Sequence, residues 1–124
     1  MREHALSDRQ REVCGLLGGN NDTMTHYYPV LNIAADRCRT FLMDPVGQLR
    51  ALKLMRERDE SMRGIFHTHP TSPAHPSPRD SDEARYPGVY YLIISMMRRE
   101  PELSVYYYDD GKFMQVTDIV EVIR

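Results

Sequence analysis

The chain has 124 residues, the size of one ordinary domain with its own hydrophobic core, and we expect a single domain over residues 1–124. Hydrophobic residues make up 41% and charged residues 27%, and the formal net charge is −2. This balance argues against electrostatic binding to nucleic acid or to a membrane surface. No apolar run approaches the length of a membrane span, and no signal peptide opens the chain. Cys14 and Cys38 form neither a metal-binding pair nor a disulfide framework, so we expect a cytoplasmic protein with reduced thiols.

The first part of the chain predicts a short helix followed by a hairpin. Residues 2–11 are mostly polar with a thin apolar stripe, which allows the helix. The next apolar run ends in paired glycines, as in a buried strand, and turn residues follow it at 20–22. The expected elements are a helix at 2–11, strands at 13–19 and 24–31, a loop around 32–36, and a short strand at 39–43.

The clearest helix begins after Asp44. An aspartate followed by proline is typical of an N-cap and a first helical position. Val46, Leu49, Leu52 and Met55 then recur at helical spacing, which predicts a helix to about residue 57.

The second half of the chain predicts more strands than helices. A strand at 63–69 precedes a proline-bearing loop at 70–78, and Ser77-Pro78-Arg79-Asp80 has the pattern of a capped helix running to about Tyr86. The remaining expected strands lie at 89–97, 103–108, 112–116 and 119–123, with a turn at 109–111. The sum is a mixed α/β domain, a mostly antiparallel sheet flanked by two or three helices.

The segment from His67 to Asp80 carries the residues with metal chemistry. Residues two apart on a strand point to the same face, so His67 and His69 can converge on one ion. Asp80, thirteen residues after His67 and in the first turn of the predicted helix, can add a carboxylate. Two imidazoles and one carboxylate suit Zn²⁺ and leave a fourth position open for water, which is typical of a catalytic zinc site.

Hydrolysis at such a site needs a general base as well. Among many acidic residues Glu12 stands out, because it directly precedes the apolar run V-C-G-L-L, where a carboxylate is hard to explain by burial alone. The other acidic residues remain open as candidates for this base.

These motifs together resemble the JAMM (MPN-plus, Mov34/PAD-1) metallopeptidases. The matching residues are E-V-C-G-L-L-G from Glu12, then H-T-H-P, and then P-S-P-R-D, with seven residues between His69 and Ser77 and Asp80 three residues after Ser77. The resemblance spans nearly the whole chain and implies a JAMM/cytidine-deaminase-like α/β fold. A lone H-x-H would be weak, whereas the joint pattern is specific.

The resemblance implies a role for each matching residue. His67, His69 and Asp80 would bind one Zn²⁺ per chain, Glu12 would act as general acid/base, and Ser77 would help to stabilise the oxyanion. Family members hydrolyse peptide or isopeptide bonds at the C-terminus of ubiquitin or ubiquitin-like proteins. Small prokaryotic members act on sulfur-carrier-type proteins ending in Gly-Gly, and some release an amino acid from them. A homodimer is compatible with the resemblance.

Two departures bear on the substrate. Gln10 stands where relatives often have proline, which affects a turn rather than the chemistry. The chain also lacks room for the long insertions with which eukaryotic relatives grip ubiquitin, and this favours a small carrier protein over ubiquitin.

Two alternative functions stay open. The chain could be a non-catalytic MPN-type interaction module, although such relatives have typically lost metal ligands. It could also be a hydrolase of the same superfamily with another substrate class. Ser77 and Asp80 are also expected to form a capping box, Cys14 is expected to be a buried apolar residue, and His75 is expected to be an exposed loop histidine that could touch substrate.

Overall fold

The computed structural model describes residues 1–21, 23–78, 80 and 88–116, and every structural statement refers to these residues. Within them the chain forms two helices and six strands: α1 (Arg2–Ser7), β1 (Cys14–Asn20), β2 (Thr23–Val30), α2 (Pro45–Glu57), β3 (Ser61–His69), β4 (Val89–Ser95), β5 (Glu102–Asp109) and β6 (Lys112–Val116). No helix in these ranges is both long enough and apolar enough to cross a bilayer.

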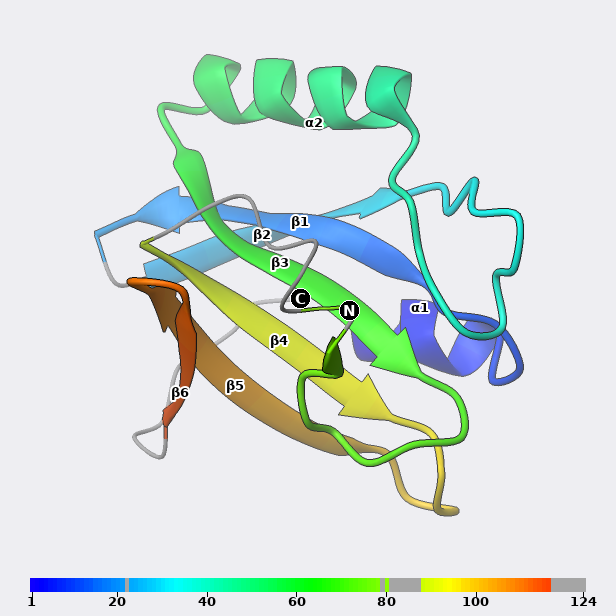
Figure 1. Ribbon diagram of the computed structural model, residues 1–124. Helices are drawn as coiled ribbons and strands as arrows, with labels where there is room; N and C mark the ends of the chain where they lie inside the picture. The colour runs from blue at the N-terminus through cyan, green and yellow to red at the C-terminus, as the bar shows by residue number, and fades with distance from the viewer. Residues whose placement is uncertain (22, 79, 81–87, 117–124) are drawn as a thin grey trace.

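The strands form one sheet in the order β2-β1-β3-β4-β5-β6. All neighbouring strands are antiparallel except β3 and β4, which are parallel, so the predicted mixed, mostly antiparallel sheet is confirmed. Cys14, the first residue of β1, lies opposite His67 near the end of β3. The start of β1 and the ends of β3 and β4 therefore meet at one end of the sheet, which we call the site end (Figure 1).

Helices lie against both faces of the sheet. On one face, called the α2 face, Ala51 and Met55 of α2 join buried side chains of the sheet, among them Leu16 and Ile65. On the opposite face Ala5 of α1 packs into a second apolar cluster. In Figure 1 α2 crosses above β1, β2 and β3, whereas α1 lies beside the site end. Successive residues of a strand alternate between these faces, so the register decides which side chains can meet.

Most of the predicted elements are present, with shifts of one or two residues at their ends. Helix α2 has the expected start: Pro45 is its first residue, and the Asp44 carboxylate accepts a hydrogen bond from the Val46 amide (3.3 Å). The predicted turn between β5 and β6 has positive φ at both Asp110 (51°) and Gly111 (72°), as a type I′ hairpin turn requires.

Two predicted elements were wrong in length or type. The helix predicted at 2–11 ends at Ser7, because the Asp8 carboxylate accepts from the Gln10 and Arg11 amides and turns the chain. The strand predicted at 39–43 is reduced to one bridge between Asn32 and Met43. The amides of residues 39 and 40 donate hydrogen bonds to the Asp36 carbonyl in the same connection, so they cannot pair with a neighbouring strand.

Two other predicted elements lie wholly or mostly outside the described residues. The strand predicted at 119–123 is outside them. Of the helix predicted after Ser77, only Pro78 and Asp80 are described, and both are helical.

Candidate metal centre

The two histidines of the H-x-H motif end the central strand β3. His67 and His69 share the α2 face with Ile65, two residues apart as the strand period requires, and their exposed fractions are 1% and 4%. Strands β1 and β4 pair with β3 on its two sides, so its backbone is held rigidly. Two adjacent imidazoles in such a setting need polar partners to offset their burial.

Three donor atoms meet at this point. The Nε2 atoms of His67 and His69 are 3.1 Å apart, and Oδ2 of Asp80 lies 3.3 Å from the first and 3.1 Å from the second. Tetrahedral zinc with bonds of about 2.0–2.2 Å to nitrogen and oxygen places its ligand atoms roughly 3.3 Å apart. The three groups therefore fit a zinc ion in both spacing and donor chemistry, and among the described residues they form a group that could hold a metal ion.

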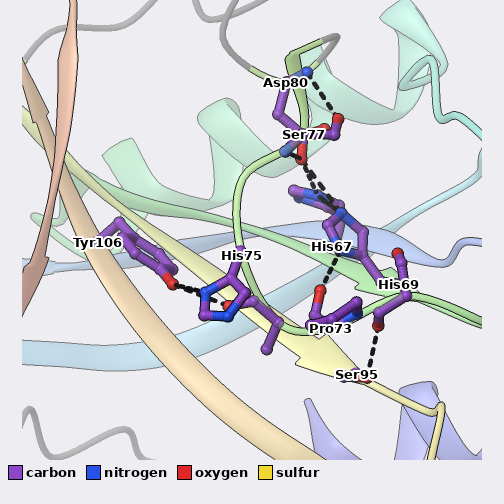
Figure 2. A network of polar contacts seen from close by, with 10 residues as sticks. His67, His69, Pro73, His75, Ser77, Asp80, Ser95 and Tyr106 are labelled. Carbon is purple, nitrogen blue, oxygen red and sulfur yellow. Dashed lines mark hydrogen bonds and ion pairs between the residues drawn. The ribbon is translucent and has the colours of Figure 1, made fainter.

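Asp80 reaches the histidines because a capping box fixes it. The Ser77 amide donates to Asp80 Oδ2 (2.8 Å), and the Asp80 amide donates to Ser77 Oγ (3.1 Å). This reciprocal pair confirms the capping box predicted from the sequence. It also holds the Ser77 hydroxyl close to Asp80, one of the three residues that carry the donor atoms (Figure 2).

The ring of His69 is oriented from behind by the backbone. Its Nδ1 lies 2.8 Å from the carbonyl of Pro73, so Nδ1 carries the proton and Nε2 presents its lone pair towards His67 and Asp80. Such a bond to the second nitrogen is what metal-ligating histidines generally make.

The ionisation of the three side chains follows from burial and mutual contact. Burial lowers the pKa of His67 and outweighs the opposing effect of Asp80. Burial also lowers the pKa of His69, but the bonds to Asp80 and to the Pro73 carbonyl, with the charges of Asp80 and Glu12, raise it overall. Although burial alone would raise the pKa of Asp80, its hydrogen bonds to both histidines hold that pKa well below its usual range. The carboxylate is therefore anionic, as a metal ligand must be.

His67 is oriented differently from His69. The described part of the chain offers no hydrogen-bonding partner to its buried Nδ1. Instead the ring of Phe41 stacks on the imidazole, with centroids 4.6 Å apart and planes inclined by 23°. An aromatic face therefore fixes this ring and covers one side of the centre.

Glu12 lies beside the histidine pair. Cys14 is opposite His67, and the Thr68 amide donates to the Val13 carbonyl (3.0 Å), so continuing the register places Glu12 opposite His69. Glu12 also falls on the α2 face, and its exposed fraction is 6%. Its charge is one of the influences on the pKa of His69. The four residues of the predicted centre are therefore brought together with Ser77 at the site end.

The loop from Pro70 to Ser77 is held over the α2 face by three contacts, one to β4 and two to β5 (Figure 2). Ser95 of β4 donates to the Ser72 carbonyl (2.6 Å). The hydroxyl of Tyr106 of β5 donates to the Ala74 carbonyl (2.9 Å). Nδ1 of His75 lies 2.9 Å from the same hydroxyl, so this exposed histidine turns towards Tyr106.

Cys14 is a core residue and not a nucleophile. It is fully buried, and its thiol donates to the Val30 carbonyl (3.4 Å). Burial, and after it the charge of Glu12, raises the pKa of the thiol to about 12. The expectation that Cys14 is a buried apolar residue is confirmed.

Sequence reasoning missed four residues that support the centre: Asn32, Phe41, Ser95 and Tyr106. Each acts across a long sequence separation, so no local spacing marks it. The one available signal was Asn32, a polar residue directly after an apolar strand, where a side chain often bonds to the backbone.

Comparison with known proteins gives the family. The family described as prokaryotic homologs of the JAB domain matches residues 1–106. The "Desampylase" of Haloferax volcanii is 38% identical over 96 residues, covering 76% of this chain and 69% of that protein. The "CysO-cysteine peptidase" of Mycobacterium tuberculosis is 34% identical over 117 residues, covering 90% and 77%. A "Probable TtuB-protein conjugate cleaving protease" of Thermus thermophilus is 35% identical over 92 residues, covering 74% of this chain and 62% of that protein.

The fold is also shared with a solved structure. A protein of Desulfitobacterium hafniense, known from its solution structure, is 34% identical and superimposes with a TM-score of 0.83 over 97% of this chain and 85% of its own. The predicted α/β fold and the predicted family are therefore confirmed. The chain belongs to the prokaryotic JAB family.

Proposed function

We propose that this protein is a zinc-dependent peptidase that hydrolyses the bond after the C-terminal Gly-Gly of a ubiquitin-like or sulfur-carrier protein. The observation that carries the proposal is the convergence of His67, His69 and Asp80 within 3.3 Å of one another, with buried Glu12 beside them. A buried cluster of this composition at a strand end has little value for stability alone, because burying polar and charged groups is unfavourable.

Each residue of the candidate centre has its own role in the proposed reaction. His67, His69 and Asp80 would hold the ion, and the Pro73 carbonyl and the Ser77 amide keep two of these ligands in place. When bound, zinc supplies a Lewis acid that polarises a carbonyl and lowers the pKa of water. Glu12, on the same face of the sheet, would take a proton from the attacking water and return it to the leaving amine.

Ser77 is suited to stabilise the developing oxyanion. Its Oγ accepts from the Asp80 amide, and a hydroxyl that accepts one bond can still donate its own proton. The capping box holds that oxygen at a fixed place beside the ligand set, so donation would need little rearrangement.

The choice of substrate class rests on relatives. Three relatives bear the names "Desampylase", "Probable TtuB-protein conjugate cleaving protease" and "CysO-cysteine peptidase", and each is at least 34% identical to this chain. A non-catalytic interaction module is the weaker reading, because such a role would not require three metal-binding side chains and a buried acid in register.

The decisive test combines zinc analysis with cleavage of carrier fusions of the form Gly-Gly-X. We expect the wild type to contain about one zinc per chain and to cut the fusion. Glu12→Gln should keep its zinc and lose about 10²–10⁴-fold in kcat, the usual contribution of a general acid/base. Glu57→Gln, an exposed acid at the end of α2, is the matched control and should be fully active.

Two outcomes would contradict the proposal. A Glu12→Gln protein as active as wild type would remove Glu12 from the mechanism. A zinc-loaded wild type that leaves a broad panel of Gly-Gly-X fusions uncut would exclude the proposed substrate class.

A further inference from the structure

Asn32 is a buried polar residue whose hydrogen-bonding capacity is fully used. It lies in the connection between β2 and α2, and its exposed fraction is 6%. Its side-chain amide donates to the carbonyls of Glu12 (2.8 Å) and Thr40 (3.1 Å). Its side-chain oxygen accepts from the amides of Ala34 (3.0 Å) and Leu42 (2.9 Å). Two donors and two lone pairs are all that an asparagine side chain has.

Three of these bonds stay inside the connection, and the fourth leaves it. The contacts to residues 34, 40 and 42 close residues 32–42 into a compact loop, which we call the Asn32 loop. The bond to Glu12 joins this loop to a residue twenty positions earlier in the chain. A residue that only organised its own loop would not need that fourth bond.

The same loop holds Glu12 at a second point. Glu12 precedes β1, so it lies outside the regular ladder with β2. Its amide instead donates to the carbonyl of Arg37 (2.6 Å), in the middle of the Asn32 loop. Both backbone hydrogen-bonding groups of Glu12 are therefore satisfied by this one loop.

The other side of the chain is held by β3. The Val13 amide donates to Thr68 Oγ1 (2.9 Å), and the Thr68 amide donates to the Val13 carbonyl (3.0 Å). The backbone at residues 12 and 13 is thus clamped between the strand that carries the histidines and the Asn32 loop. The direction of the Glu12 carboxylate relative to His69 depends on this clamp.

We infer that Asn32 is a positioning residue for Glu12: it fixes the backbone of the proposed general acid/base so that the carboxylate stays beside the metal ligands. This rests on the proposed function for the role of Glu12. No other common side chain of this size supplies two donors and two acceptors from one planar group. Aspartate keeps the shape but turns both donors into acceptors facing the carbonyls of Glu12 and Thr40.

The first test follows the backbone of Glu12 by amide hydrogen exchange in metal-free protein, so it does not depend on activity. In Asn32→Asp we expect the protection of the Glu12 amide to fall by about tenfold or more, the equivalent of one lost hydrogen bond. The protection of Leu16, in the middle of β1, should stay within about twofold of wild type. Asn32→Ser, which keeps one donor, provides a second variant should Asn32→Asp fail to fold.

Val30→Ala is the matched control for general destabilisation. Val30 is buried at the end of β2 and touches none of the side-chain bonds of Asn32. Its loss should lower the protection of Glu12 and Leu16 by the same factor. Unchanged protection at Glu12 in both Asn32 variants would overturn the inference.

The second test asks whether the loss acts through Glu12. In zinc-loaded protein we expect Asn32→Asp to lower kcat by about 10- to 100-fold, with KM and zinc content near wild type. In the Glu12→Gln background the same change should lower kcat by less than about threefold, because the group that it positions is gone. An equal loss of kcat in both backgrounds would overturn the positioning role. So would an Asn32→Asp protein in which the Glu12 amide has lost protection while kcat stays at the wild-type value.

The two proposals fail separately. A wild type that cuts no carrier fusion counts against the proposed function, whereas the exchange of the Glu12 amide still shows whether Asn32 holds that backbone.

Discussion

The ring of Phe41 orients the imidazole of His67, and the carbonyl of Pro73 orients that of His69. The two contacts differ in their physical nature. The carbonyl fixes a proton on Nδ1 of His69 and thereby sets its tautomer. The stacked phenyl ring restricts the tilt of the His67 imidazole and keeps water from one of its faces, but it does not select a tautomer. One candidate ligand is therefore oriented by a hydrogen bond and the other by packing.

Phe41→Ala should weaken zinc binding. Removing the ring frees the His67 imidazole to rotate, and groups that support metal ligands typically contribute 10–100-fold in affinity. We expect a loss at the lower end, about tenfold, measured by competition with a chelator of known affinity. Phe41→Tyr keeps the aromatic face and should bind zinc as wild type does. Equal affinities for the alanine and tyrosine variants would contradict this role of Phe41.

At the scale of elements, β3 carries different polar clusters at its two ends. Its last residues belong to the candidate metal centre, and Glu60, directly before its first residue, belongs to a second cluster that joins β2 to α2. The Glu60 carboxylate accepts from the hydroxyl of Tyr28 (2.6 Å) and also contacts Thr25 and His26 of β2. Arg58, at the end of α2, donates to the same Tyr28 hydroxyl (3.0 Å). This cluster ties the edge strand to the end of the helix.

The Glu60 cluster should make stability depend on pH. Burial alone would raise the pKa of Glu60, but the bonds from Thr25, Tyr28 and His26 outweigh it and lower the pKa below the ordinary value of 4.5. A carboxyl group whose pKa is lower in the folded state stabilises the fold above its unfolded pKa. That contribution disappears as the pH falls through the folded pKa.

Glu60→Gln should therefore be less stable than wild type near neutral pH, and the difference should shrink on acidification below the ordinary pKa of glutamate. Urea denaturation of metal-free protein at a series of pH values measures this difference. Glu57→Gln, at an exposed neighbouring position, is the matched control for the loss of a surface carboxylate. A difference in the free energy of unfolding between Glu60→Gln and wild type that stays constant at all pH values would show that the charge of Glu60 does not contribute to stability.

The features that could be predicted from the sequence are those that depend on the spacing of nearby residues. Residues two apart on β3 had to share a face, and the serine and acid at the start of a helix had to cap it, so the meeting of His67, His69 and Asp80 could be predicted. The failed strand at 39–43 shows the limit. Its backbone groups are taken by the Asn32 side chain and the Asp36 carbonyl, contacts that depend on how a loop folds back and leave no periodic signature.

At the scale of the molecule, the centre draws on parts of the chain far apart in sequence. Glu12 comes from the segment before β1, the histidines from β3, and Asp80 from the helix start after the loop. The two Nε2 atoms and Oδ2 lie at a spacing that suits tetrahedral zinc only because these parts have packed together. An ion bound there would favour the folded state over the unfolded chain, in which the donors are dispersed.

Zinc should therefore raise the melting temperature. At about a hundredfold excess over Kd the linkage is worth about 2.7 kcal/mol, or roughly 10 °C for a chain of this length. Adding a chelator should reverse the shift in differential scanning fluorimetry. Asp80→Ala, which removes one ligand, should lose most of the shift, and Glu57→Gln should keep it. A full shift in Asp80→Ala would place the ion elsewhere.

The directions in which the strands run have a practical consequence for attaching the protein to a support or a label. β3 and β4 end where β1 begins, and β5 runs antiparallel to β4. The turn at Asp110-Gly111 therefore lies at the end of the sheet away from the candidate metal centre. Both residues of this turn have positive φ and lie at the surface. A fluorophore or surface anchor attached there would leave the site end facing solution. An immobilised enzyme could then meet a bulky protein conjugate without the support obstructing its approach.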